Sequence, residues 1–415
     1  MSDTTITAAD RTILRELGKQ LAEAAALPIM EERRRLWRRH NALKGERAMI
    51  LVFPEGAWRE LLPDASLSCQ GQRARAIEQG MRMALYEHAH FQQDKPVEAY
   101  FPVAKAFTNS GWGLEAQWHF SDDPTGARAF APVIQDAADL QKIKAPKLTL
   151  DEEQTQRRLR EAHELFDGVL PVRLVGVRHI SFHLLNTYTS LRGLEQVMMD
   201  MIEEPQMLHD AMGILERGNR GLVEQYEQLG LLDLNNDDTY HSSGGVGYSD
   251  ELPAPGYSGK VRPCDMWCSA ESQELAQVSP EMHEEFALTY ERRLLEPFGL
   301  NGYGCCEDLT RKLDDVMTIR NIRRLSISPW ANFDACAEKL KGRAIFSWKA
   351  HPAHLAGNFH ADQVRAYIRH TVEVCKANGC MLEMILKDTH TCDHHPERFD
   401  QWTTIAREEV SRVWG

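Results

Sequence analysis

The chain has 415 residues, of which 43% are hydrophobic and 26% are charged, values typical of a folded globular protein. Its formal net charge of −13 argues against nucleic acid as the main partner, because phosphate binding needs concentrated Lys and Arg. No run approaches about 18 apolar residues and residues 1–8 lack a basic start, so we expect a cytoplasmic chain without membrane contact.

Nine cysteines are too few for a disulfide scaffold, and their odd number fits reduced thiols. Cys336 and Cys375 lie in helical patterns and are expected to be small buried residues. The Arg-rich stretch at 31–40 is expected to be a solvated helix face or an anchor for carboxylates rather than a nucleic-acid arm.

Helical spacing of apolar residues runs from 7 to 44 and is broken at Pro28. We therefore predict an N-terminal helical extension over residues 1–46, followed by one domain over 47–415. The stretch 236–273 is the longest without regular periodicity, and a loop of that size is expected to be a functional lid. Within it, "GGVGY" (244–248) lacks the strand and helix context of a dinucleotide-binding fingerprint.

After residue 47, short apolar runs alternate with longer helical patterns, which indicates parallel strands joined by helices. The predicted strands are 49–54, 97–103, 172–178, 231–235, 299–304, 323–328, 344–348 and 381–386. Eight such units predict an α/β fold in the form of a closed (β/α)8 TIM-type barrel, with its active site at the carboxyl ends of the strands. An open doubly wound sheet is the alternative.

Polar side chains follow most of the predicted strands and are expected to meet at this one end. The set comprises Glu55, Lys105, His179, Asp237, Asp238, His241, Cys305, Cys306, Glu307, Trp330, Lys349, His351, Lys387, Asp388, His390 and Cys392. Thiolates and imidazoles gathered in one place suit zinc, so the candidate metal ligands are Cys305, Cys306, His390 and Cys392. The alternatives are ordinary turn thiols for the adjacent pair and a solvated loop for 390–395.

Three other members of this set each have two possible roles. Asp237 could hold a base or a substrate cation, but the surrounding Asn and Asp residues are also good turn formers. His351 precedes a proline and fits a strand-end ligand or a capping side chain. Trp330 could wall a pocket for a flat substrate, or pack a loop over the barrel.

The segments "YGCCEDLTRKLDDVMTIRNIRRLSISPWAN" (303–332), "SWKAHPAHL" (347–355) and "EMILKDTHT" (383–391) resemble the uroporphyrinogen decarboxylase-like superfamily, in its branch of corrinoid-linked methyltransferases. The likeness runs from about residue 30 and is most specific in the final third. It implies a (β/α)8 barrel with zinc held by a His-x-Cys motif and a later Cys. Here the motif falls on Gly304 and Cys306, or on Tyr303 and Cys305, so its His is missing, whereas Cys392 matches the later Cys.

That departure leaves the third zinc ligand open among Glu307, His351 and His390. The resemblance implies transfer of a methyl group from a small methoxylated, aromatic substrate to the cobalt of a corrinoid carried by a partner protein. A Lewis acid or a proton donor at the leaving atom would lower the barrier. The candidate catalytic residues are Glu307, His351, Asp237 and His241, and the candidate substrate-binding residues are Glu55, His179, Trp330 and Lys349. A decarboxylase of a small acid and a non-catalytic binding barrel are the alternatives, and a homodimer is left open.

Overall fold

The structure is a computed structural model that describes residues 6–120, 128–241 and 244–415. Residues 1–5 of the predicted helical extension and residues 242–243 of the predicted long loop lie outside this described part. Within it, no helix combines the length and the apolar character needed to cross a bilayer.

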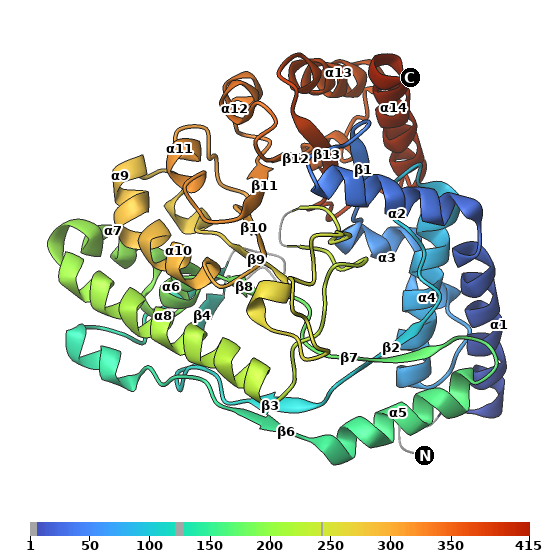
Figure 1. The fold of residues 1–415 in the computed structure, drawn as a ribbon, viewed down its shortest axis with the longest axis horizontal. Coiled ribbons are helices and arrows are strands. Elements are labelled where there is room, and N and C mark those ends of the chain that lie inside the picture. Colours follow the sequence, from blue (N-terminus) through green and yellow to red (C-terminus); the bar gives the residue numbers. More distant parts are fainter. Residues whose placement is uncertain (1–5, 121–127, 242–243) are drawn as a thin grey trace.

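Seven parallel strands form one curved sheet in the order β1, β13, β12, β11, β10, β9, β8 (Figure 1). Their bounds are β1 (Met49–Val52), β8 (Ser181–Phe182), β9 (Trp267–Ala270), β10 (Leu300–Tyr303), β11 (Ile322–Ile327), β12 (Ile345–Lys349) and β13 (Met381–Leu386). Parallel neighbours need crossover connections, and helices make them here. The α/β class predicted from the alternating pattern is therefore confirmed.

The helices that follow the strands lie around the outside of the curved sheet (Figure 1). They are α6 (Leu184–Arg192), α7 (Leu194–Glu203), α8 (Pro205–Gln228), α9 (Pro280–His283), a π-helical turn (Glu284–Leu288), α10 (Thr289–Leu295), α11 (Leu313–Val316), α12 (Phe333–Leu340), α13 (Ala361–Ala377) and α14 (Glu397–Trp414). Outward-facing strand residues such as Ile50, Phe346 and Met384 pack with these helices in the main hydrophobic core. Cys336 and Cys375 are buried in the same core, as predicted, and all nine cysteines are free thiols.

The sheet of the described residues is open between β1 and β8, so the predicted closed eight-stranded barrel is not shown. Three predicted strands lie outside this sheet, and the one at 172–178 is β7 (Val172–Val175). The predicted strand at 97–103 is β2 (Phe101–Ala104), which pairs in parallel with β7 (Val172–Val175) as a separate ribbon. The predicted strand at 231–235 is reduced to a single bridge between Leu232 and Val177.

Side chains rather than a neighbouring strand satisfy the free edge of β1. Val52 N donates to Gln93 Oε1 at 3.0 Å, and Ile50 N donates to Asp94 Oδ2 at 2.9 Å. Asp94 N returns a bond to Ile50 O at 2.8 Å. These contacts occupy the edge groups that would otherwise recruit another strand. They explain why a chain with a barrel-like sequence pattern ends its sheet here.

The long loop fills the interior of the curved sheet instead of covering its end, which corrects the lid predicted for 236–273 (Figure 1). Val246 and Tyr248 are buried against Trp37 and the inner side of β1 and β13. Beneath them, Arg324 on β11 and Glu383 on β13 form a fully buried ion pair with a 2.9 Å contact between Nε and Oε1. The final part of the predicted loop is strand β9, which the sequence pattern missed.

Close packing explains the glycines of "GGVGY". A Cβ on Gly244 would lie 1.9 Å from Cδ of Arg324, and one on Gly247 would lie 2.1 Å from Asn235 O. Only glycine lets the backbone approach these groups so closely. The motif is therefore part of the interior packing and not a phosphate cradle.

The N-terminal part forms a second layer beside the sheet. It contains α1 (Ala8–Ala25), α2 (Pro28–Asn41), α3 (Trp58–Leu61), α4 (Gln72–His90) and α5 (Glu152–Phe166), together with the β2–β7 ribbon. Pro28 opens α2, in agreement with the predicted break. Two short antiparallel pairs complete the described part: β3 (Phe107–Asn109) with β6 (Leu148–Leu150), and β4 (Gln117–Phe120) with β5 (Arg128–Ala131).

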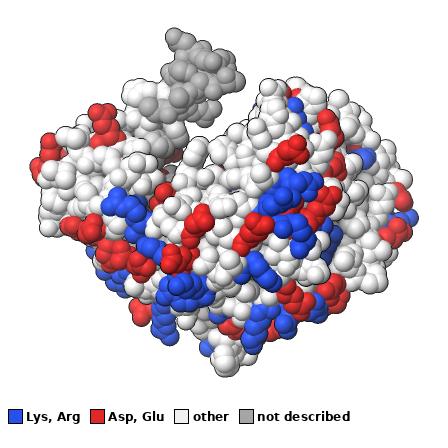
Figure 2. Space-filling model, turned by 90° about the horizontal axis from the view of Figure 1, so that it is seen from above, with Lys and Arg blue, Asp and Glu red and all other residues white. Residues whose placement is uncertain are grey.

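Four of the five arginines of α2 are paired with carboxylates, whereas Arg33 donates to the Lys95 carbonyl. Arg34 Nε contacts Glu98 Oε1 at 2.9 Å, and Arg35 bridges Glu32 and Glu46. On the face drawn in Figure 2, basic and acidic side chains likewise lie interspersed. The predicted role of the Arg-rich stretch as an anchor for carboxylates is confirmed.

Candidate active site

Five titratable side chains gather at the carboxyl edge of the sheet, and we call this group the mouth. His183 starts α6, Glu271 follows β9, Cys305 follows β10, Lys349 ends β12 and Lys387 follows β13. Burial lowers the pKa of the three bases, and a negative charge at Cys305 opposes this for each of them. Clusters of titratable groups with shifted pKa values at strand ends mark candidate active sites.

His183 and Glu271 form the shortest polar contact of the mouth. Nδ1 of His183 lies 2.5 Å from Oε1 of Glu271, whose other oxygen accepts from Gln273 N at 2.9 Å. Burial lowers the pKa of His183, but the hydrogen bond and charge of Glu271 outweigh it, so the pKa is raised above its ordinary value. The His183 side chain is 42% exposed while Glu271 is buried. This arrangement is that of a proton donor held by a buried carboxylate.

Two lysines supply positive charge beside the thiol of Cys305. Lys349 is buried and donates to Ser347 Oγ at 3.1 Å, and burial lowers its pKa to about 7, although Glu383 opposes the shift. The pKa of Lys387 is raised, because the charges of Asp388 and Cys305 outweigh the effect of burial. Lys387 is therefore a fixed cation at the mouth, whereas Lys349 can exchange a proton near neutral pH.

The hydroxyl of Tyr240 is a further polar group near the mouth. It is buried and has no hydrogen-bond partner among the described residues, and the Tyr240 ring contacts Phe53 in a tilted arrangement with centroids 4.6 Å apart. Burial raises the pKa of Tyr240 well above its ordinary value, with a further contribution from the charge of Cys305. A buried hydroxyl without a partner is available to a bound substrate.

Cys305 and Cys306 lie side by side after β10, with their sulfur atoms 3.6 Å apart, and Cys306 is exposed. Glu307 is buried behind them and accepts from Cys305 N at 2.7 Å. Burial and the charge of Glu271 raise the pKa of Glu307 to about 7. As predicted, two thiols and a carboxyl group lie together at this strand end, and Glu307 faces the protein interior.

A buried polar network supports this side of the mouth. Tyr303 donates to Glu291 at 2.6 Å, and both Ser272 and His283 lie 2.9 Å from the Tyr303 hydroxyl. Burial raises the pKa of Glu291 well above its ordinary value, so its carboxyl is held neutral. Burial lowers the pKa of His283 to about 3. These groups fix the end of β10 without adding charge to it.

Trp330 and His351 form the rim of the mouth after β11 and β12. Trp330 is 69% exposed, and its ring meets that of His351 edge to face at 4.9 Å. His351 Nδ1 accepts from Ala353 N at 3.2 Å, so the capping role left open in the sequence is the one seen. Glu55, after β1, lies near Lys387 and His390, and burial raises its pKa while Lys387 opposes the shift.

Four predicted site residues lie elsewhere or make other contacts. Asp237 pairs with Arg173 at 3.2 Å and Arg178 at 3.1 Å, at the edge of the β2–β7 ribbon. His241 is buried against Trp267, bonds to Asn235 O at 3.1 Å and has its pKa lowered well below the ordinary value by burial. His179 is exposed and contacts the Tyr240 carbonyl at 3.3 Å. These contacts favour packing and positioning roles for all three.

Cys392, the fourth, is buried in the loop after β13. Its thiol donates to Glu60 Oε2 at 3.0 Å, and burial together with Glu60 raises its pKa to about 12. Within residues 6–120, 128–241 and 244–415, no group of three or more His, Cys, Asp or Glu side chains is placed to hold a metal ion. The predicted ligands Cys305, Cys306, His390 and Cys392 are thus not assembled, and the residues present do not fit a zinc site.

The sequence pattern missed two members of the mouth, His183 and Glu271, and gave no role to Lys387. His183 follows β8, a two-residue strand too short to show periodicity. Glu271 follows β9, which lay inside the predicted loop. The signal that could have located them is the apolar run "MWCSA" (266–270), a compact segment that ends in an acidic residue.

Comparison with known proteins gives little further guidance. No family model matches the chain, and no curated protein matches it. Among solved structures, a methyltransferase from Methanosarcina mazei is similar with a TM-score of 0.49 and 12% sequence identity, over 91% of this chain and 98% of that chain. A likeness at this level identifies neither a family nor an activity.

Proposed function

We propose that the chain is a methyltransferase whose active site is the mouth, with His183 as the proton donor. The observation that carries the proposal is the 2.5 Å contact between His183 and Glu271 at the carboxyl edge of the sheet. We further infer that the fold is a (β/α)8 arrangement in which Gln93, Asp94 and the inserted loop take the place of the eighth strand between β1 and β8.

The chemistry proposed is cleavage of a methyl ether. The methyl group passes to a nucleophile, the oxygen keeps the bonding electron pair, and the proton of the His183 imidazolium neutralises that oxygen. An unprotonated alkoxide or phenoxide is a poor leaving group, so a positioned acid contributes about 10²–10⁴ in rate. Glu271 holds the imidazole in the donating tautomer and stabilises its protonated form.

We propose that the methyl acceptor is the cobalt of a corrinoid brought by a separate protein. This acceptor follows from the sequence resemblance, and the exposed Trp330 offers an aromatic contact on the rim over which such a carrier would dock. No step of the proposal runs through zinc, because Cys392 donates to Glu60 and the described residues hold no group of three or more potential metal ligands. The cytoplasmic location and the homodimer stay expectations.

The two lysines favour a methoxylated aromatic acid as substrate. Lys387 is a cation at the mouth and Lys349 becomes one when an anion approaches, since its pKa is already about 7. A carboxylate on the substrate would therefore be bound by charge-assisted hydrogen bonds. The ring of the substrate would lie toward Phe53 and Tyr240, with the Tyr240 hydroxyl as an additional donor.

The same lysines support a second candidate, decarboxylation of a small acid. In that reaction the carbon–carbon bond to the carboxylate breaks, carbon dioxide leaves, and His183 protonates the resulting carbanion. The two candidates differ in product, because only the first forms a methylated acceptor and a free hydroxyl group.

The experiment is a product assay with the purified protein, chemically reduced cob(I)alamin and a panel of methoxybenzoates. Methylcobalamin is followed by its absorbance and the hydroxybenzoate by chromatography. We expect both products in equal amounts, and no carbon dioxide. The matched control is His370→Gln, which breaks an exposed histidine–carboxylate pair with Asp334 outside the mouth and should leave turnover unchanged. Carbon dioxide without methylcobalamin would establish the second candidate instead.

A further inference from the structure

A cavity lies away from the mouth, between α1, α4 and the extended segment 93–102. Its volume is about 410 Å³, within the range of small-molecule sites. Apolar side chains from three elements form its body, among them Leu21, Ile77, Met81, Phe101 and Leu170. The cavity can therefore hold a small organic molecule with an apolar part.

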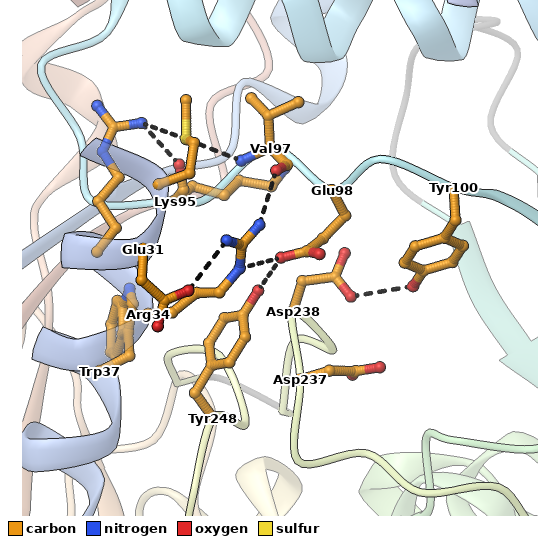
Figure 3. Close-up of polar contacts among 12 residues, drawn as sticks. Glu31, Arg34, Trp37, Lys95, Val97, Glu98, Tyr100, Asp237, Asp238 and Tyr248 are labelled. Atoms are coloured by element: carbon orange, nitrogen blue, oxygen red, sulfur yellow. Dashed lines mark hydrogen bonds and ion pairs between the residues drawn. The ribbon is translucent and has the colours of Figure 1, made fainter. Parts of the chain in front are cut away.

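One end of the cavity is polar, and its groups are drawn in Figure 3. Glu98 is paired with Arg34, whose Nε contacts it at 2.9 Å, and the Tyr248 hydroxyl donates to the same oxygen. Asp238 faces Glu98 from the opposite side and accepts from the Tyr100 hydroxyl at 3.2 Å (Figure 3). These two carboxylates lie at one end of the cavity, each on a segment without regular secondary structure.

Asp238 is the carboxylate of this end with too little positive charge around it. Arg178 lies 3.8 Å from Asp238 but 3.1 Å from Asp237. Arg173, the other partner of Asp237, is shared with Asp233 at 3.9 Å, so two arginines face three aspartates. Burial raises the pKa of Asp238, with Asp237 and Glu98 adding to the shift and Arg178 opposing it. Lys95, the other cation lining the cavity, is paired with Glu87 at 2.7 Å. A cation placed at Asp238 would thus meet an undercompensated negative charge.

Gly80 gives independent support for a built cavity. It lies in the middle of α4, lines the cavity, and a Cβ added there would meet no atom within 4 Å. Glycine destabilises a helix interior relative to alanine, so its presence here is not explained by the helix itself. Its effect is to keep the wall of the cavity free of side-chain atoms.

We propose that this cavity is a binding site for a small organic amine, whose apolar body packs between α1 and α4 and whose ammonium group binds Asp238. The ligand class follows from the charge balance, since an anion would face Glu98 and Asp238 and a neutral molecule would leave Asp238 uncompensated. The site does not depend on the chemistry of the mouth, and either proposal can fail without the other.

The test uses benzylamine and its neutral analogue benzyl alcohol as probes, with binding to the full chain measured by isothermal titration and ligand-observed NMR. We expect saturable one-to-one binding of benzylamine. Asp238→Asn should weaken benzylamine by at least about tenfold and leave benzyl alcohol within about twofold. Thermal melting checks that the variant is folded.

Gly80 provides the matched pair of variants. Gly80→Trp fills the cavity and should weaken both probes by at least about tenfold, whereas Gly80→Ala leaves room and should change neither by more than about twofold. Benzylamine binding that survives Gly80→Trp, or that is unchanged in Asp238→Asn, would overturn the proposal. So would the lack of saturable binding to the wild-type chain at millimolar benzylamine.

Discussion

Nδ1 of His183 lies 2.5 Å from Oε1 of Glu271, and this contact joins the start of α6 to the end of β9. A helix N-terminus disfavours a cation, so the imidazolium at this position depends on the carboxylate beside it. The pair therefore sets both the direction in which His183 can donate and the pH range over which it carries a proton.

Replacing Glu271 by Gln should move the pH profile of methyl transfer. Only protonated His183 donates, so activity falls as pH rises through its pKa, which the hydrogen bond and charge of Glu271 raise against the opposing effect of burial. Without that charge, the alkaline limb of kcat should shift to lower pH by about one unit or more. The measurement is kcat against pH for both proteins. An alkaline limb at the same pH in Glu271→Gln would show that His183 is not the titrating acid.

Lys349→Met should change how stability depends on pH. The pKa of Lys349 is about 7 in the folded chain and 10.5 ordinarily, so between these values only the unfolded chain holds the extra proton. Stability of the wild type must then rise with pH, relative to Lys349→Met, by about 1.4 kcal/mol per pH unit. Urea unfolding of both proteins at pH 7 and pH 9 measures this difference. If the stability difference between wild type and Lys349→Met is the same at both pH values, the pKa of Lys349 lies near its ordinary value.

Gly244→Ala should strongly destabilise the chain, because the added Cβ would lie 1.9 Å from Cδ of the buried Arg324. Overpacking of this kind costs about 1–3 kcal/mol of the free energy of unfolding. Gly221→Ala, on α8 with no atom within 4 Å of the added Cβ, should instead stabilise by about 0.5–1 kcal/mol. Chemical unfolding measures whether the free energy of unfolding falls in Gly244→Ala and rises in Gly221→Ala. Equal changes in the two variants would contradict the tight packing of the loop around Gly244.

Cys392→Ala tests the role assigned to the late cysteine. Loss of its hydrogen bond to Glu60 should cost about 1 kcal/mol of stability, while turnover and metal content stay within about twofold of wild type. Elemental analysis and activity are measured together on the purified protein. If the wild type contains stoichiometric zinc and Cys392→Ala loses it, Cys392 is a zinc ligand, as the resemblance implies.

The later strands could be predicted from the sequence because each is a short segment with apolar residues that is mostly buried. The predicted 381–386 coincides with β13, and 299–304, 323–328 and 344–348 differ from β10, β11 and β12 by one residue at each end. β9 was hidden because Trp267 and Cys268 adjoin a long irregular segment whose role is to fill the interior. The sequence could not show that the sheet ends at β1. The side chains of Gln93 and Asp94 cap this strand, and such contacts leave no periodic pattern in the sequence.

The candidate site was predicted in its location but only partly in its members. Cys305, Glu307 and Lys349 do lie at the strand ends, because parallel strands bring successive carboxyl ends together. Asp237, His241 and Cys392 follow strands or turns as well, yet their partners Arg178, Asn235 and Glu60 draw them to other contacts. Which way a side chain turns at a loop depends on such distant partners, and sequence spacing does not encode them.

The most direct test of the central claim is the dependence of turnover on the leaving oxygen, measured for wild type and His183→Gln with methoxybenzoates that carry ring substituents. If His183 supplies the proton, turnover by the wild type should vary little with the pKa of the phenol formed. His183→Gln should lose about 10²–10⁴ in kcat with a poor leaving group and much less with a nitro-substituted one. An equal loss across the series, or none, would contradict His183 as the proton donor.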